Sequence, residues 1–161
     1  MNLSHWFHDQ LQASGEGFIW SALQVPGPRR LITPPDGLGE WTAARHVFHM
    51  LFYERNLALP GMRLWLGGPY PSLADLDEDG AWEREKAGFD SLIDGFRQVR
   101  TEQIVLLPRF DDAAWDTPYQ TDWGSVTLTW VVSKTYQHTA EHTNDILKIA
   151  LFWDAFEARQ K

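Results

Sequence analysis

The chain contains no cysteine among its 161 residues. This absence excludes disulfide bonds, thiolate metal ligands, a cysteine nucleophile and a dithiol redox centre. Any thiol chemistry that the protein carries out must therefore use a thiol that a substrate brings in.

Basic residues are also scarce, and they are scattered along the chain. There are 14 lysines and arginines against 22 aspartates and glutamates, which gives a formal net charge of −8. Proteins that bind nucleic acids neutralise phosphates with clustered basic side chains. We therefore expect no nucleic-acid partner.

Long apolar runs are missing as well. No stretch approaches the ~18 apolar residues that a membrane span needs, and the first residues lack the basic start and apolar run of a secretory signal. We therefore expect a cytoplasmic protein with no membrane partner. Residues 1–161 are enough for a single domain, and 43% of them are apolar, which is enough to form its core.

Apolar residues recur with helical spacing in four segments, which are residues 3–23, 42–59, 82–107 and 128–158. Thr42 and Thr127 are the expected N-caps of the second and fourth segments. We expect residues 109–124 to be irregular. The connections exceed the roughly 2 to 8 residues of simple helical bundles. The sequence therefore predicts an all-α fold, a four-helix bundle with long connections.

His138 and His142 lie four residues apart in the last predicted helix. Side chains at this spacing share one helix face, so two imidazoles can bind one metal ion. The same face carries a core stripe at steps of three and four, namely Leu128, Val131, Thr135, His138, His142, Ile146, Ile149, Trp153 and Phe156. The stripe predicts that both histidines point inward.

A third histidine from a facing helix would complete a site with open coordination positions, the pattern typical of catalytic metal sites. His46 and His49 lie in the second helix, and His5 and His8 lie in the first. Spacing alone does not choose among them. His5 and His8 lie near a chain end that frays, and we interpret them as surface residues.

Two motifs together resemble a known family. Residues 41–50 begin with Trp-Thr and place a histidine eight positions after the tryptophan, and residues 137–142 contain the spacing His-x-x-x-His. The chain is similar in these motifs, and in its length and helix layout, to the DinB/YfiT-like metalloenzymes. The resemblance implies that His49, His138 and His142 are the metal ligands, with His46 as their neighbour.

The acidic residues near these histidines have several interpretations. Glu54 matches a glutamate that the family usually carries after the helix-two histidine, and we expect it to orient groups or bridge helices. Glu141 and Asp145 lie one turn or less from the ligands. They either accept the outer ring N–H of a ligand or are solvated helix charges.

The stretch Asp75 to Gly80 copies the first half of an EF-hand loop. Lys86 stands where that loop needs its bidentate glutamate, so calcium binding is disfavoured. We interpret the stretch as an acidic loop that favours the positive end of the helix after it.

Three uncharged imidazoles suit a divalent transition metal. We expect zinc, with nickel or iron as alternatives. The resemblance implies a metal-dependent enzyme that transfers a low-molecular-weight thiol to an electrophile, similar to the bacillithiol and mycothiol S-transferases. The metal would lower the pKa of the thiol.

Two other functions stay open. One is a hydrolase that activates water at the same site, which a carboxylate at the open face of the metal would favour. The other is a non-catalytic metal- or ligand-binding protein of a stress response. Nine tryptophans and the family resemblance also suggest a homodimer.

Overall fold

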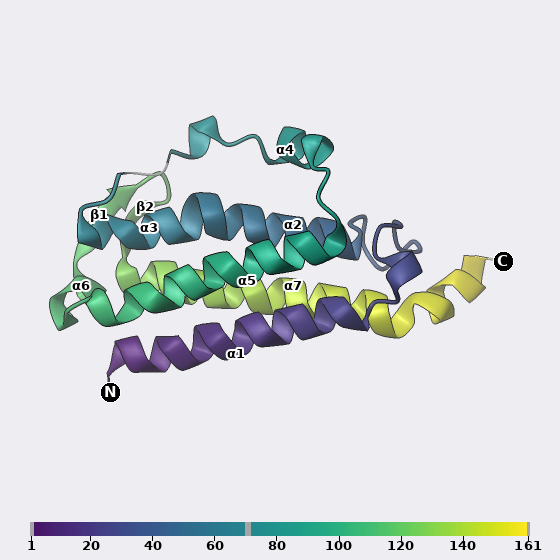
Figure 1. Ribbon diagram of the computed structural model, residues 1–161, viewed down its shortest axis with the longest axis horizontal. Helices are drawn as coiled ribbons and strands as arrows, with labels where there is room; N and C mark the ends of the chain where they lie inside the picture. The colour runs from purple at the N-terminus through teal and green to yellow at the C-terminus, as the bar shows by residue number, and fades with distance from the viewer. Residues whose placement is uncertain (1, 70–71, 161) are drawn as a thin grey trace.

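The structure is a computed structural model that describes residues 2–69 and 72–160. The long helical segments lie side by side in Figure 1. They are α1 (Leu3–Gln24), α2 (Ala43–Tyr53) continued by α3 (Leu59–Arg63), α5 (Phe89–Leu106) and α7 (Leu128–Glu157). The prediction of a predominantly α-helical chain is confirmed.

The direction of these helices explains one of the long connections. In Figure 1, α1 and α7 run from left to right, whereas α2 and α5 run from right to left. The chain must therefore return along the whole molecule between α3 and α5. This crossing segment passes above α2 and carries the short helix α4 (Glu78–Arg84).

Shorter elements complete the fold. Single turns of 3-10 helix occur at Gly27–Arg29, Leu64–Leu66, Leu73–Asp75, Leu107–Arg109 and Ala158–Gln160. The segment that we expected to be irregular, residues 109–124, instead contains the helix α6 (Asp112–Asp116) and leads into a hairpin of β1 (Pro118–Thr121) and β2 (Gly124–Thr127). Gly124 adopts a positive φ of 92°, which suits a tight turn between two strands.

Both predicted threonine caps are present. The hydroxyl of Thr42 accepts a hydrogen bond from the backbone N–H of Arg45 at 3.0 Å, and that of Thr127 accepts one from Trp130 at 3.2 Å. Each hydroxyl satisfies a backbone donor that has no partner inside its helix. The starts of the two histidine-bearing helices are therefore fixed by local sequence.

The prediction of one continuous helix over residues 82–107 was wrong. Helix α4 ends at Arg84 and α5 begins at Phe89. Between them, Glu85 adopts an extended conformation, and Gly88, a residue of low helix propensity, precedes the first turn of α5. This break frees α4 to pack against α2 instead of extending α5.

The second helical segment continues beyond Pro60, where we expected it to end. A π-helical turn at Glu54–Ala58 separates α2 from α3, and Pro60 lies in the first turn of α3. Just before Pro60 the π-helical turn lengthens the backbone hydrogen bonds by one residue, so that the N–H of Leu59 donates to Glu54. The second helical segment therefore extends to Leu66.

The core stripe of α7 is present in most of its nine positions. Six of its residues are buried, namely Leu128, Val131, Thr135, Ile146, Ile149 and Trp153. The other three, His138, His142 and Phe156, are only half-buried. The two histidines therefore face α2 where the core opens toward solvent.

A buried ion pair joins α5 to the π-helical turn. Glu54 is 0% exposed and Arg100 is 4% exposed, and Arg100 Nε donates to Glu54 at 3.1 Å. Gln103 donates to the same carboxylate at 3.0 Å, while Arg100 also donates to Thr139 on α7 at 2.7 Å. Glu54 thus bridges helices, as expected from the sequence.

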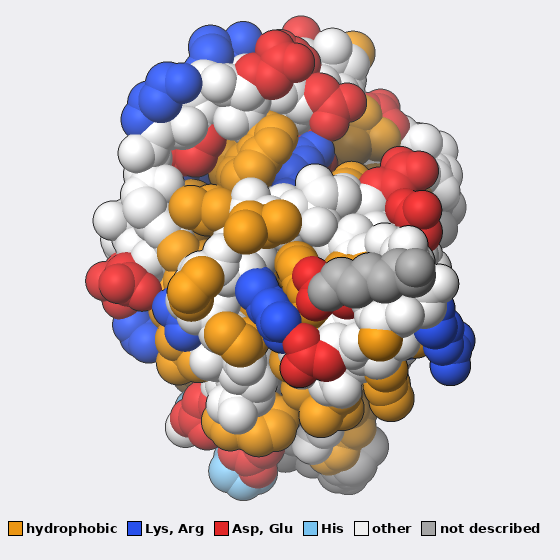
Figure 2. Space-filling model, turned by 90° about the vertical axis from the view of Figure 1, so that its right-hand side faces the viewer, with side chains coloured by type: hydrophobic (Ala, Val, Ile, Leu, Met, Phe, Trp, Pro, Cys, Tyr) orange, Lys and Arg blue, Asp and Glu red, His pale blue; other side chains and the backbone are white. Residues whose placement is uncertain are grey.

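No helix in the described part of the chain is long and apolar enough to cross a membrane. Figure 2 shows the end of the molecule near the C-terminus, where basic side chains lie scattered among acidic ones.

Candidate metal centre

The structure brings the three histidines that we predicted to the same point between α2 and α7. The Nε2 atom of His138 lies 3.0 Å from that of His49 and 3.1 Å from that of His142. The ligand atoms of all three side chains lie within 4.8 Å of one another. Two long helices therefore aim three imidazole nitrogens at one small volume.

This geometry fits a single metal ion. Nitrogen ligands at ~2.05 Å from a tetrahedral zinc ion lie ~3.3 Å from one another, close to the separations of 3.0 and 3.1 Å found here. Among the described residues, Nδ1 of His138 is buried without a hydrogen-bond partner. The only nitrogen of this ring with polar neighbours is therefore the one that points into the centre.

The outer nitrogen of His49 faces a carboxylate on α4. Both oxygens of Glu78 lie within hydrogen-bond distance of Nδ1 of His49, at 2.8 and 2.9 Å. If the carboxylate accepts the hydrogen on Nδ1, the lone pair of His49 is on Nε2 and points into the centre. Glu78 was not among the residues predicted from the sequence. It lies in the acidic stretch of residues 75–80, which we expected to be a loop, but in the structure it is the first residue of α4.

Burial keeps most of these imidazoles neutral. It lowers the pKa of His46 and of His138 from 6.5 to about 4. The pKa of His142 falls to about 2, because burial acts together with His49 and His138 beside it. Neutral imidazoles have free lone pairs at neutral pH, which metal binding requires.

Two aromatic side chains pack against the centre, one from the residue before the N-cap of α2 and one from the last residue of α2. The indole of Trp41 stacks on His142 at 5.9 Å between ring centroids and lies 5.0 Å from His49. The ring of Tyr53 meets His138 edge-on at 4.5 Å. Burial raises the pKa of Tyr53 to about 12 despite its hydrogen bond with Thr135, so its phenol stays protonated.

The two acidic residues that the sequence left open behave differently. Glu141 is exposed and accepts a hydrogen bond from Gln137 at 2.6 Å, so it is a solvated helix charge. Asp145 has a carboxylate oxygen within 4.8 Å of ring nitrogens of His46 and His142, and it pairs with Lys148 at 2.9 Å. Asp145 lies beside the centre without joining the three-histidine group.

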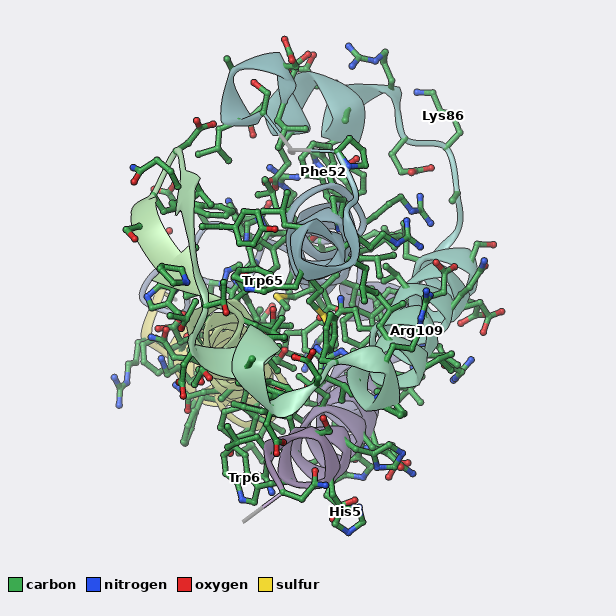
Figure 3. All side chains as sticks on the ribbon, turned by 90° about the vertical axis from the view of Figure 1, so that its left-hand side faces the viewer. His5, Trp6, Phe52, Trp65, Lys86 and Arg109 are labelled. Carbon is green, nitrogen blue, oxygen red and sulfur yellow. The ribbon has the colours of Figure 1, made fainter. Side chains whose placement is uncertain are left out.

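His5 and His8 take no part in the centre. Figure 3 shows His5 at the start of α1, pointing away from the molecule. Nδ1 of His8 contacts only its neighbour Asp9, at 3.1 Å, among the polar groups recorded for it. Their interpretation as surface residues agrees with this placement.

A cavity of about 460 Å³ adjoins the centre on the side of His46 and His142. Trp41 and Asp145 line it as well, together with residues of the loop that precedes α2. Its size falls in the range of small-molecule sites.

Comparison with known proteins places the chain in a family. A search of curated proteins found no match. Residues 20–146 match the model of the DinB superfamily, and this range, more than half of the chain, contains His49, His138 and His142. The chain belongs to the DinB superfamily.

Proposed function

We propose that this protein is a metal-dependent transferase that joins a low-molecular-weight thiol to an electrophile. The observation that carries the proposal is the convergence of three Nε2 atoms from α2 and α7, with separations of 3.0 and 3.1 Å. Such a site leaves coordination positions open for a substrate. When bound there, a divalent ion lowers the pKa of a thiol that reaches it.

The placement of carboxylates favours thiol activation over water activation. A hydrolase needs a general base within hydrogen-bond reach of the attacking water. In the described part of the chain, no carboxylate joins the group formed by His49, His138 and His142. Glu78 lies on the outer nitrogen of His49 instead, and Asp145, which lines the adjoining cavity, is paired with Lys148 at 2.9 Å.

The residues of the chain have separate tasks in this proposal. Glu78 and His46 accept hydrogens from outer ring nitrogens and so keep the Nε2 lone pairs free. Trp41 and Tyr53 shield the centre from water, which strengthens electrostatic interactions inside it. The adjoining cavity has room for part of a small-molecule substrate.

An assay with 1-chloro-2,4-dinitrobenzene tests the proposal. The thiolate sulfur forms a bond to the ring carbon, the bond from that carbon to chlorine breaks, and chloride leaves while the thiol proton passes to solvent. We expect a panel of thiols to include one whose conjugation requires zinc-loaded protein. His138→Ala should abolish this activity.

The other two functions are distinct outcomes of the same experiment. Zinc-loaded protein that hydrolyses esters or amides but conjugates no thiol would replace the proposal with the hydrolase. Protein that binds metal and a ligand without turnover would favour the non-catalytic stress-response protein.

We propose zinc as the ion, with nickel or iron as alternatives, because neutral imidazoles bind all three and zinc ranks high in affinity. Purified protein without an affinity tag should carry about one zinc ion per chain, as is usual for a single three-histidine site. Elemental analysis that finds mainly nickel or iron would correct this assignment.

We further propose that residues 1–161 form one four-helix domain, built from α1, the α2–α3 segment, α5 and α7.

We also propose that two copies of the chain associate through α1 and α7. The dimer is supported by exposed apolar side chains on both helices, among them Trp20 at 56% and Leu151 at 71%. Light scattering should give the mass of a dimer, and Leu151→Glu should give that of a monomer.

A further inference from the structure

Helix α4 places one side chain, that of Glu78, against the outer nitrogen of His49 at the candidate metal centre. We infer that Glu78 is a positioning residue that orients His49 for the metal, and that it couples metal binding to the seating of α4 on α2. The inference rests on the proposed metal site, and it assigns a role to a segment that contributes no ligand.

The contact between Glu78 and His49 is specific in its geometry. Both carboxylate oxygens lie close to the same atom, Nδ1 of His49, at 2.8 and 2.9 Å. An ionised carboxylate can only accept hydrogens, so this contact selects the tautomer with the hydrogen on Nδ1. It also fixes the rotation of the ring, which keeps Nε2 directed at His138.

Glu78 is itself held in place by Arg45, which lies one turn before His49 on α2. Nη2 of Arg45 is 2.9 Å from Glu78 and 2.8 Å from Asp79. The arginine side chain is only 7% exposed. A buried guanidinium loses much of its hydration, so its ion pair with Glu78 restricts the carboxylate more than a surface pair would.

Aromatic side chains keep this arginine from moving. Its guanidinium lies over Trp41 at 4.8 Å, over Phe48 at 5.3 Å and over Trp82 of α4 at 5.5 Å. Cations within about 6 Å of a ring centroid are attracted to its face. Arg45 therefore joins Trp41, which stacks on His142, to α4.

These contacts define the position of α4, because residues 85–88 interrupt the helix between α4 and α5. Besides the contacts of Arg45 and Glu78, the ring of Trp82 packs on Phe48 at 5.2 Å. A cation at Nε2 of His49 makes the N–H at Nδ1 a stronger donor and so strengthens its bond to Glu78. By reciprocity, seating of α4 must favour metal binding to the same extent.

The test compares two substitutions that remove the same charge from neighbouring positions. Glu78→Gln weakens the contacts to His49 and Arg45, whereas Asp79→Asn affects only the contact to Arg45, since Asp79 has no recorded contact with His49. Zinc affinity is measured by competition with a chromophoric chelator. We expect Glu78→Gln to weaken zinc binding roughly 10- to 100-fold, and Asp79→Asn to weaken it less than about 3-fold.

A double-mutant cycle separates positioning from general destabilisation. In a His49→Ala background, Glu78→Gln should leave the remaining zinc affinity unchanged, because the residue through which it acts is gone. Hydrogen exchange adds a second readout. Amides of α4 should exchange more slowly in zinc-loaded wild-type protein than in metal-free protein, and this difference should shrink in Glu78→Gln.

The outcomes distinguish this inference from the proposal on which it rests. Equal zinc affinity for wild type and Glu78→Gln would overturn the role of Glu78 and leave the metal site standing. An equal loss in Glu78→Gln and Asp79→Asn would also overturn it, because loss of charge alone would then explain the effect. Wild-type protein that binds no metal would overturn both.

Discussion

The Nδ1 atoms of His46 and His142 lie 2.8 Å apart, so one ring donates a hydrogen and the other accepts it. Burial lowers the pKa of His46 to about 4 and that of His142 to about 2, which keeps both rings neutral at neutral pH. If Nε2 of His142 binds a metal, its hydrogen must be on Nδ1. His46 is then the acceptor.

The first prediction concerns the three candidate ligands. His49→Ala or His138→Ala should lose its zinc during gel filtration, because two remaining imidazoles hold the ion far more weakly than three, with an affinity that only titration at high zinc concentration measures. His5→Ala is the matched control, since His5 points away from the molecule (Figure 3). Elemental analysis after gel filtration measures the zinc content. Retention of zinc by His49→Ala would contradict the assignment.

The second prediction concerns His46 as the hydrogen-bond acceptor for His142. His46→Ala should weaken zinc binding roughly 10- to 100-fold, the usual effect of removing such a partner. His46→Asn should restore much of the loss, because its amide oxygen can accept a hydrogen close to the position of Nδ1. Chelator competition measures both variants. Equal affinities for the two variants would mean that His46 acts by packing alone.

The third prediction concerns acid stability without metal. The pKa of His46 and of His138 is about 4 in the folded protein and 6.5 when unperturbed. Between these values the unfolded state binds more protons, so the free energy of unfolding should fall as the pH drops from about 6.5 toward 4. Above pH 6.5 these groups should contribute no pH dependence, because they are neutral in both states.

Urea unfolding in the presence of a chelator, at several pH values from 7.5 to 4.5, measures this effect. Other groups titrate in the same range, so the informative quantity is the difference in slope between wild type and His46→Ala. The variant should lose less stability per pH unit than the wild type. A steeper slope in the variant would contradict the prediction.

The fourth prediction concerns the buried pair of Glu54 and Arg100. Glu54→Gln leaves the guanidinium buried without its counter-charge and should cost about 3 to 5 kcal/mol of unfolding free energy. The control is Glu102→Gln, because Glu102 and its partner Arg63 are 44% and 47% exposed. This substitution should cost at most about 1 kcal/mol. Equal costs in urea unfolding would show that burial does not decide the strength of the pair.

The sequence alone predicted the features that depend on neighbours along the chain. Thr42 and Thr127 cap their helices because a hydroxyl reaches a backbone donor only three residues away. The stripe on α7 could be read from spacing, since the helix repeat places residues three and four apart on one face. It predicted that His138 and His142 point inward, and both are half-buried where α7 meets α2.

Local sequence was less informative where helices break or continue. The helix that we expected from residue 82 is interrupted at residues 85–88, and α4 packs on α2 instead, a contact between segments far apart in the chain. Conversely, the chain stays helical beyond Pro60 because a π-helical turn starts a new helix before it.

Only the tertiary structure decided which groups surround the three histidines. Glu78 reaches His49 from a segment 29 residues away in sequence, and His46 meets His142 across 96 residues. Helix periodicity gives the direction of a side chain on its own helix, but the distance between two helices depends on how all their side chains pack. For this reason the sequence indicated the histidines, and the fold alone determined what holds them in position.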